Sequence, residues 1–80
     1  MVEPERLLVG LGQALRALRT EQRLSQETLS LETGVHRNYI GGVERGERQP
    51  SVTVLVKLCQ ALGVPASEML RRAEQLAERR

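Results

Sequence analysis

Residues 25–46 read SQETLSLETGVHRNYIGGVERG, and this stretch decides the fold. Ser25 is a good N-cap, because its hydroxyl can accept a backbone N–H of the helix that we predict over residues 26–33. Gly34 supplies the permissive backbone that ends this helix. A second short helix is predicted over about residues 37–45, directly after the glycine turn. Two short helices joined in this way form a recognisable structural unit.

The residues inside this unit have the sizes that close packing of its two helices requires. Ser30 is small and stands where the helices cross, and Gly34 stands at the sharp turn. Four apolar residues are predicted to fix the pair to the core: Leu29, Val35, Ile40 and Val43. The combination is far more specific than any one of these residues.

A longer helix is predicted before this unit, over about residues 4–22, with Pro4 in its first turn. Its leucines recur at spacings typical of an amphipathic helix: Leu7, Leu8, Leu11, Leu15 and Leu18. Gly10 and Gly12 lie inside this helix at a cost of about 1 kcal/mol each relative to alanine. They indicate either a close packing contact or an unstable first turn.

Two further helices are predicted after the unit. Ser51 is expected to cap the first, which ends at Gly63 and turns these residues inward: Val52, Leu55, Leu58, Cys59 and Leu62. The second, over residues 66–80, carries one apolar stripe: Met69, Leu70, Ala73, Leu76 and Ala77. No repeat or linker appears. The sequence therefore predicts a compact all-α fold of five helices in a single domain over residues 1–80.

Composition agrees with a small helical domain. The chain has 80 residues, no Trp or Phe and one Tyr, so its core must consist of aliphatic side chains. A chain of this length buries only about 60% of the surface that its unfolded form exposes, so a partner subunit is the expected source of extra stability. The formal charge is only +2, but all the cations except one lysine are arginines, whose planar guanidinium suits phosphate and guanine.

Several classes of protein are disfavoured by what the sequence lacks. One Cys and one His cannot form a four-ligand zinc site, and neither an Asp nor a phosphate-binding glycine loop is present. We therefore expect no metal, no cofactor and no enzyme activity. No stretch approaches the roughly 20 apolar residues of a membrane span, and no signal segment opens the chain, so a cytoplasmic protein is expected. Cys59 is interpreted as a core residue, with redox sensing as the alternative.

The chain resembles the Xre or Cro/cI-like regulators of bacteria and phages, through residues 24–70, which read LSQETLSLETGVHRNYIGGVERGERQPSVTVLVKLCQALGVPASEML. Taken more widely, the resemblance extends from about Leu11 to Leu70. It implies that residues 26–45 form a helix-turn-helix whose second helix lies in the major groove of double-stranded DNA. It also implies two protomers on adjacent half-sites, roughly one helical turn apart, and a role in transcriptional control.

Within this family, residues 36–48 (HRNYIGGVERGER) look most like the small controller proteins of restriction–modification operons, which act on their own promoters. The alternative is an antitoxin, or another protein-interaction module, that holds its partner through the last helix and binds DNA only secondarily. The chain has no second domain to hold a small-molecule ligand, so none is expected. We expect activity to follow protein concentration through formation of a homodimer.

Three positions depart from the family pattern. His36 stands where a Ser, Thr or Asp commonly caps the second helix of the motif, and Ser30 replaces the commoner alanine. Gly42 stands where many relatives have a polar side chain that contacts a base. Base recognition is therefore expected to depend on the first turn of the helix over residues 37–45.

Three residues in that first turn are predicted to contact bases: Arg37, Asn38 and Tyr39. Arg37 lies where the helix dipole is positive, so its charge is unfavourable by about 0.3–1 kcal/mol and its presence indicates a function. A bidentate contact to guanine is that function, with a solvated surface arginine as the alternative. For Asn38 and Tyr39 the alternative to a base contact is a hydrogen bond to phosphate.

Five residues around the motif are predicted to contact DNA phosphates: Ser25, Gln26, His36, Arg45 and Arg48. Gln26 begins a helix, where its backbone N–H and its side-chain amide can both meet a phosphate. For His36 the alternative is a capping role alone, and for the two arginines it is a solvated charge.

Two structural roles complete the predictions. Arg19 and Glu44 match family positions that form an ion pair, which would orient the recognition helix. Met69, Ala73 and Leu76 lie on one stripe of the last helix and are predicted to form the dimer interface, although the same stripe could pack on its own domain.

Overall fold

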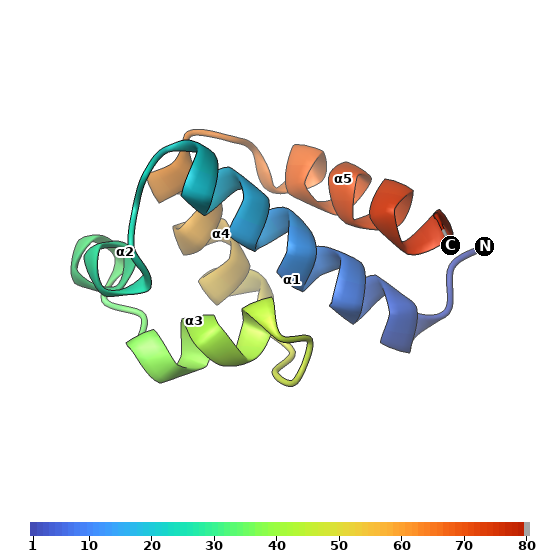
Figure 1. Ribbon diagram of the computed structural model, residues 1–80, viewed down its shortest axis with the longest axis horizontal. Coiled ribbons are helices and arrows are strands. Elements are labelled where there is room, and N and C mark those ends of the chain that lie inside the picture. The colour runs from blue at the N-terminus through green and yellow to red at the C-terminus, as the bar shows by residue number, and fades with distance from the viewer. Residues whose placement is uncertain (80) are drawn as a thin grey trace.

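The structure is a computed structural model that describes residues 1–79. These residues form five α-helices and no strand, as Figure 1 shows: α1 (Pro4–Glu21), α2 (Gln26–Thr33), α3 (Arg37–Glu44), α4 (Val52–Leu62) and α5 (Ala66–Glu78). The predicted all-α fold is confirmed, and helix ends differ from the predicted ones by a residue or two. Residue 80, which the prediction placed in the last helix, lies outside the described part.

The helices are arranged around α1, the longest of them. Figure 1 shows α5 running alongside α1 in the opposite direction, so that the N-terminus and the C-terminal end of α5 lie close together. The α2–α3 pair lies at the other side of the molecule, where α3 contacts α1 and α2 contacts α4. The N-terminal turn of α3 is thereby held away from α5.

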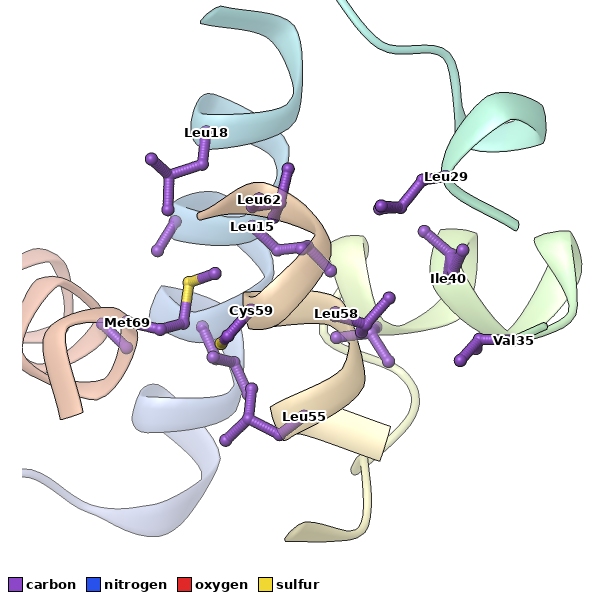
Figure 2. Packing of buried hydrophobic residues seen from close by; sticks show 14 residues of the cluster. Leu15, Leu18, Leu29, Val35, Ile40, Leu55, Leu58, Cys59, Leu62 and Met69 are labelled. Atoms are coloured by element: carbon purple, nitrogen blue, oxygen red, sulfur yellow. The ribbon is translucent and has the colours of Figure 1, made fainter. Parts of the chain in front are cut away.

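The core is aliphatic, as the composition predicted. Figure 2 shows side chains from all five helices converging, and these are among the largest that are fully buried: Leu15, Leu29, Ile40, Leu58 and Met69. Burying each contributes about 1.5–3 kcal/mol relative to leaving it exposed. The apolar residues predicted to fix the two-helix unit to the core, Leu29, Val35, Ile40 and Val43, are all buried.

The turn between α2 and α3 forms as the sequence predicts. The Ser25 hydroxyl accepts the backbone N–H of Thr28 at 2.9 Å and so caps α2. Gly34 ends that helix with a φ of 76°, a left-handed conformation that glycine adopts without strain. Only Val35 and His36 separate Gly34 from the first residue of α3, so the turn is short enough to fix the angle between the helices.

Gly10 and Gly12 mark two close helix contacts, which decides between the two interpretations of these glycines. A Cβ atom at Gly10 would overlap the carbonyl oxygen of Ala73 in α5, and one at Gly12 would lie 2.5 Å from the carbonyl oxygen of Glu44 in α3. Both obstacles are backbone atoms, which cannot rotate away. The glycines of α1 therefore allow α5 and α3 to approach closely, and the first turn of α1 is formed.

The close approach of α5 corrects the predicted dimer interface. Met69 and Ala73 are 0% exposed in a single chain, since this face of α5 packs against α1 and the core. They have no surface to offer to a second subunit, so the prediction for these two residues is wrong. Leu76 is only partly buried and remains a predicted contact.

Two residues of α4 that were predicted to point inward, Val52 and Cys59, lie in opposite environments. Val52 was predicted to point inward but is 77% exposed, because it lies at the first helical position, before α4 reaches the core. Cys59 is 1% exposed, and burial raises the pKa of its thiol. An inaccessible thiol that is harder to ionise is unreactive, so Cys59 is a core residue.

Within residues 1–79, no single helix has the length and apolar content needed to cross a membrane. Helices α4 and α5 meet that test only when taken as a pair, and a bend of 98° separates them.

The contact at Gly10 predicts an unusual response to alanine. Gly10→Ala should lower the free energy of unfolding by about 1–3 kcal/mol, because the new methyl group forces α5 away from α1. Gly41→Ala is the matched control: its Cβ meets only the ends of flexible side chains, so the usual preference of helices for alanine should leave stability unchanged or higher. Urea unfolding measures both, and two equally stable variants would contradict the close contact.

Candidate nucleic-acid interface

A buried ion pair joins α1 to the end of α3. The Arg19 guanidinium donates from Nε to Glu44 Oε2 at 2.6 Å and from Nη2 to Oε1 at 3.0 Å, and its Nη1 donates to the carbonyl oxygen of Leu24 at 2.7 Å. The two side chains are only 11% and 4% exposed. The hydrogen bonds that Arg19 donates to Glu44 raise the pKa of Arg19 above its usual value. The predicted ion pair is therefore present and well satisfied.

The same carboxylate also holds α2. Gln26 Nε2 donates to Glu44 Oε1 at 3.0 Å, so Glu44, the last residue of α3, accepts hydrogen bonds from both α1 and α2. The side-chain amide of Gln26 is thus engaged within the protein. Its backbone N–H lies at the first position of α2 and has no acceptor inside that helix. A phosphate contact through this N–H stays a prediction.

The N-terminal turn of α3 is capped by an imidazole. His36 Nδ1 accepts the backbone N–H of Asn38 at 3.1 Å, so the ring is a functional cap. Nδ1 must be unprotonated to accept, which leaves an Nε2–H as a donor. A cap and a phosphate contact are therefore compatible in this residue. Arg37 and Asn38 follow directly and are both exposed.

Tyr39 has a different environment from its two neighbours. Its ring is partly buried against the core, and its hydroxyl donates to the carbonyl oxygen of Gln49 at 3.1 Å. The guanidinium of Arg48 lies over the ring, with Cζ 5.3 Å from the ring centroid. The base contact of Tyr39 stays a prediction, and its hydroxyl proton already has an acceptor in the protein.

The cations near α3 are available for a ligand, whereas those on α5 are paired. Arg71 Nη2 and Arg72 Nε lie 2.7 and 3.0 Å from Glu68 Oε2, and these bonds lower the pKa of Glu68 to about 2. By contrast, Arg37 and Arg48 form no ion pair within residues 1–79. The guanidinium groups of Arg37 and Arg48 are thus available to an anionic ligand.

Arg45 is bound only loosely. Its Nε lies 3.1 Å from Glu47 Oε1, but both side chains are more than 60% exposed. Such a pair contributes at most about 1 kcal/mol and is easily exchanged for another anion. Arg45 is therefore free enough to make the phosphate contact predicted for it.

Among residues 1–79, no three His, Cys, Asp or Glu side chains come close enough together to hold a metal ion. The arrangement of α2 and α3 instead presents exposed hydrogen-bond donors in α3, at the ends of the two helices and in the following loop: Ser25, His36, Arg37, Asn38, Arg45 and Arg48. Their chemistry suits the oxygen atoms of phosphates and the edges of bases.

The two-helix unit also has a match among protein families. The sequence model described as helix-turn-helix matches residues 15–69, which is more than half of the chain and includes α2, α3 and α4. The chain belongs to the helix-turn-helix family. The resemblance inferred from the sequence is therefore confirmed.

Controller proteins of restriction–modification systems are among the relatives of this helix-turn-helix protein. The control protein C.SmaI of Serratia marcescens is 40% identical over 62 residues, which cover 78% of this chain and 74% of that protein. The restriction-modification controller protein C.AhdI from Aeromonas hydrophila is 50% identical in sequence. Its crystal structure matches this one with a TM-score of 0.75, and the match covers 78% of this chain and 94% of that chain.

A structure with DNA has the same fold. The controller protein C.Esp1396I, solved as a tetramer in complex with its natural 35 base-pair operator, is 23% identical and has a TM-score of 0.80. The match covers 91% of this chain and 96% of that one. At this level of identity the likeness shows the fold alone.

Sequence reasoning missed three features of the helix-turn-helix. The carbonyl oxygen of Gln49 anchors Tyr39, and Gly42 is covered by Arg48. Leu31 in α2 is 81% exposed and lies beside Arg37 at a shallow hollow in the surface. A pair of glycines inside a helix was a signal for the second feature, whereas backbone carbonyl contacts leave no trace in a sequence.

The buried carboxylate predicts a large loss of stability on truncation. Glu44→Ala should lower the free energy of unfolding by about 3–5 kcal/mol, since it leaves the buried Arg19 charge without a counter-charge. The control Glu47→Ala removes an exposed carboxylate and should cost less than about 1 kcal/mol. Denaturant unfolding compares them, with Glu44→Gln as a milder variant if Glu44→Ala does not fold. Similar small losses for both alanine variants would contradict the central role of Glu44.

Proposed function

We propose that this chain is a sequence-specific DNA-binding regulator of transcription that acts in the cytoplasm, and that it is not an enzyme. It binds double-stranded DNA as a homodimer, with α3 in the major groove. The observation that carries the proposal is the exposed Arg37 at the first position of α3, on a helix whose orientation is fixed by the buried Arg19–Glu44 pair.

Arg37 is the residue to which we assign base recognition. Its guanidinium is exposed and has no ion-pair partner within the described chain, and the helix dipole disfavours a cation at that end of α3. An anion or an acceptor-rich base edge relieves this cost. A bidentate contact to guanine O6 and N7 provides about 1–3 kcal/mol of discrimination against other bases. Asn38, exposed one residue later, is placed to contact a neighbouring base.

Phosphate contacts position the helix on the duplex. His36, Arg45 and Arg48 flank α3 at its two ends, and the backbone N–H of Gln26 and the hydroxyl of Ser25 lie at the start of α2. These groups lie on both sides of the first turn of α3, so their contacts to the DNA backbone determine how deeply α3 enters the major groove. Each neutralised phosphate steepens the salt dependence of binding, with a slope near −0.9 per contact in log units.

The relatives support a more specific assignment. C.SmaI and C.AhdI are controller proteins of restriction–modification systems, and their similarity supports autoregulation of such an operon by this chain. The C.Esp1396I structure is a tetramer in complex with one operator, so this fold is compatible with binding of DNA by more than one copy. Because Met69 and Ala73 are buried, the second subunit is assigned to surface that stays accessible on α5, including Leu76.

DNA titration tests the proposal. The chain should bind a duplex from upstream of its own gene more tightly than a scrambled duplex, as measured by fluorescence anisotropy at two salt concentrations. Arg37→Ala should lose about 1–3 kcal/mol of this preference. Lys57→Ala is the control, because Lys57 is an exposed cation on α4 beside Glu32 and Thr33, outside the proposed interface.

Equal losses for Arg37→Ala and Lys57→Ala would show that binding reports only net charge, which contradicts sequence recognition by α3. Equal weak binding of the parent to both duplexes at every salt concentration would contradict self-regulation from the upstream site.

A further inference from the structure

Gly42 lies in the middle of α3 and is buried although it has no side chain. The atoms that cover it come from a single residue. An ideal Cβ at Gly42 would lie 2.5 Å from Cγ, 3.3 Å from Cβ and 3.7 Å from Cδ of Arg48. The aliphatic part of the Arg48 side chain therefore lies flat across α3, in the space that any other residue at position 42 would fill.

The backbone around Arg48 is folded onto the same place. The N–H groups of Glu47 and Arg48 both donate to the carbonyl oxygen of Gly42, at 2.8 and 3.1 Å. The Tyr39 hydroxyl holds the next residue of the loop through the carbonyl oxygen of Gln49. The loop after α3 is thus attached to the helix on both sides of Arg48.

The guanidinium of Arg48 is positioned by the ring of Tyr39. Cζ lies 5.3 Å from the ring centroid, within the range of a cation–π interaction. Contact with the ring face leaves the N–H groups at the guanidinium edge available to acceptors, since these point outward in the guanidinium plane. Gly42 and Tyr39 together therefore restrict both ends of an otherwise flexible side chain.

The neighbouring glycine is different. An ideal Cβ at Gly41 would meet only the end of Arg45, with Nη1 at 3.1 Å, and the amide of Gln26, with Oε1 at 3.4 Å. These atoms end flexible side chains and can move aside. Glycine is unfavourable inside a helix, and the position of Arg48 gives a structural reason for its presence at position 42.

We propose that Gly42 is a positioning residue for DNA binding, which seats Arg48 across α3 and over Tyr39 so that a loop arginine becomes a fixed part of the DNA-contacting surface. The proposal rests on the function proposed above and adds a requirement to it. An arginine that is already held in its bound conformation loses less freedom when it meets a phosphate. Substitution at Gly42 acts on DNA only through the position of Arg48.

A double-mutant cycle tests this coupling. Gly42→Ala should weaken binding to the upstream duplex by about tenfold, the effect of losing one charge-assisted hydrogen bond, and Arg48→Ala should weaken it by a similar factor. In the Arg48→Ala background, Gly42→Ala should cause no further loss of affinity. Truncation to alanine removes Cγ and Cδ of residue 48 and leaves only its Cβ, which lies 3.3 Å from the new methyl group. Thermal melting checks that each variant remains folded at the temperature of the titration, so that a loss of affinity is not a loss of structure.

A second measurement needs no DNA. Arg48 Cζ lies 5.3 Å from the centroid of the Tyr39 ring, and the chain has no Trp, Phe or second Tyr, so a large ring-current shift of the Arg48 side-chain protons is assigned to Tyr39. These NMR shifts should be present in the parent and in Gly41→Ala, and lost in Gly42→Ala.

The outcomes separate this proposal from the proposed function. Ring-current shifts lost together with affinity, and no additional loss in the double variant, support it. Shifts lost with unchanged affinity would overturn it, as would an equal loss of affinity from Gly42→Ala in the Arg48→Ala background, since Gly42 would then contact or admit DNA directly. If the parent binds neither duplex while the shifts follow the predicted pattern, the seating of Arg48 is right and the DNA-binding function is wrong.

Discussion

The carboxylate of Glu44 is the interaction on which the rest of the structure depends. It accepts hydrogen bonds from Arg19 in α1 and from Gln26 in α2 while it ends α3, and it is almost completely buried. A buried charge is costly unless its hydrogen-bonding capacity is filled. Small rotations of α3 would break these bonds, so the angle of the recognition helix is fixed more strictly than apolar packing alone would fix it.

Close backbone contacts complement this polar contact. Gly12 lets α1 pass near the carbonyl groups at the end of α3, beside the Arg19–Glu44 pair, and Gly10 lets α5 lie along the other part of α1. Helix α1 thus serves as the frame for both sides of the molecule. On one side of α1, Met69 and Ala73 of α5 are buried in the core. On the other side, α3 carries the exposed turn at Arg37. Because its helices pack closely, this short chain holds both α3 and α5 against α1 with few large side chains.

The sequence was sufficient for most of the fold and for part of the interface. Ser25, Gly34 and the spacing of Leu29, Ile40 and Val43 carry local signals for caps, turns and packing, so the α2–α3 unit was predicted closely. The Arg19–Glu44 pair came from a family resemblance. By contrast, the stripe at Met69 and Ala73 shows that one face of α5 is apolar but not which surface covers it, and here the neighbour is α1 of the same chain.

The remaining differences arise from tertiary contacts. Val52 has the residue type of a core position, yet its place at the start of α4 leaves it exposed. The role of Arg48 depends on the fold of a loop that returns to Gly42 and Tyr39, a contact that no periodicity encodes. The sequence therefore indicated which residues lie near the interface, whereas the contacts between their side chains could not be predicted from it.

Protection of guanine N7 from methylation tests most directly the claim that α3 lies in the major groove with Arg37 on a guanine. The parent should protect guanines in two patches of the upstream duplex whose centres are about one helical turn, or 10 base pairs, apart. Arg37→Ala at saturating concentration should lose one protected guanine in each patch and keep the others. Protection confined to adenine N3 in the minor groove, or a pattern that Arg37→Ala leaves unchanged, would contradict the account.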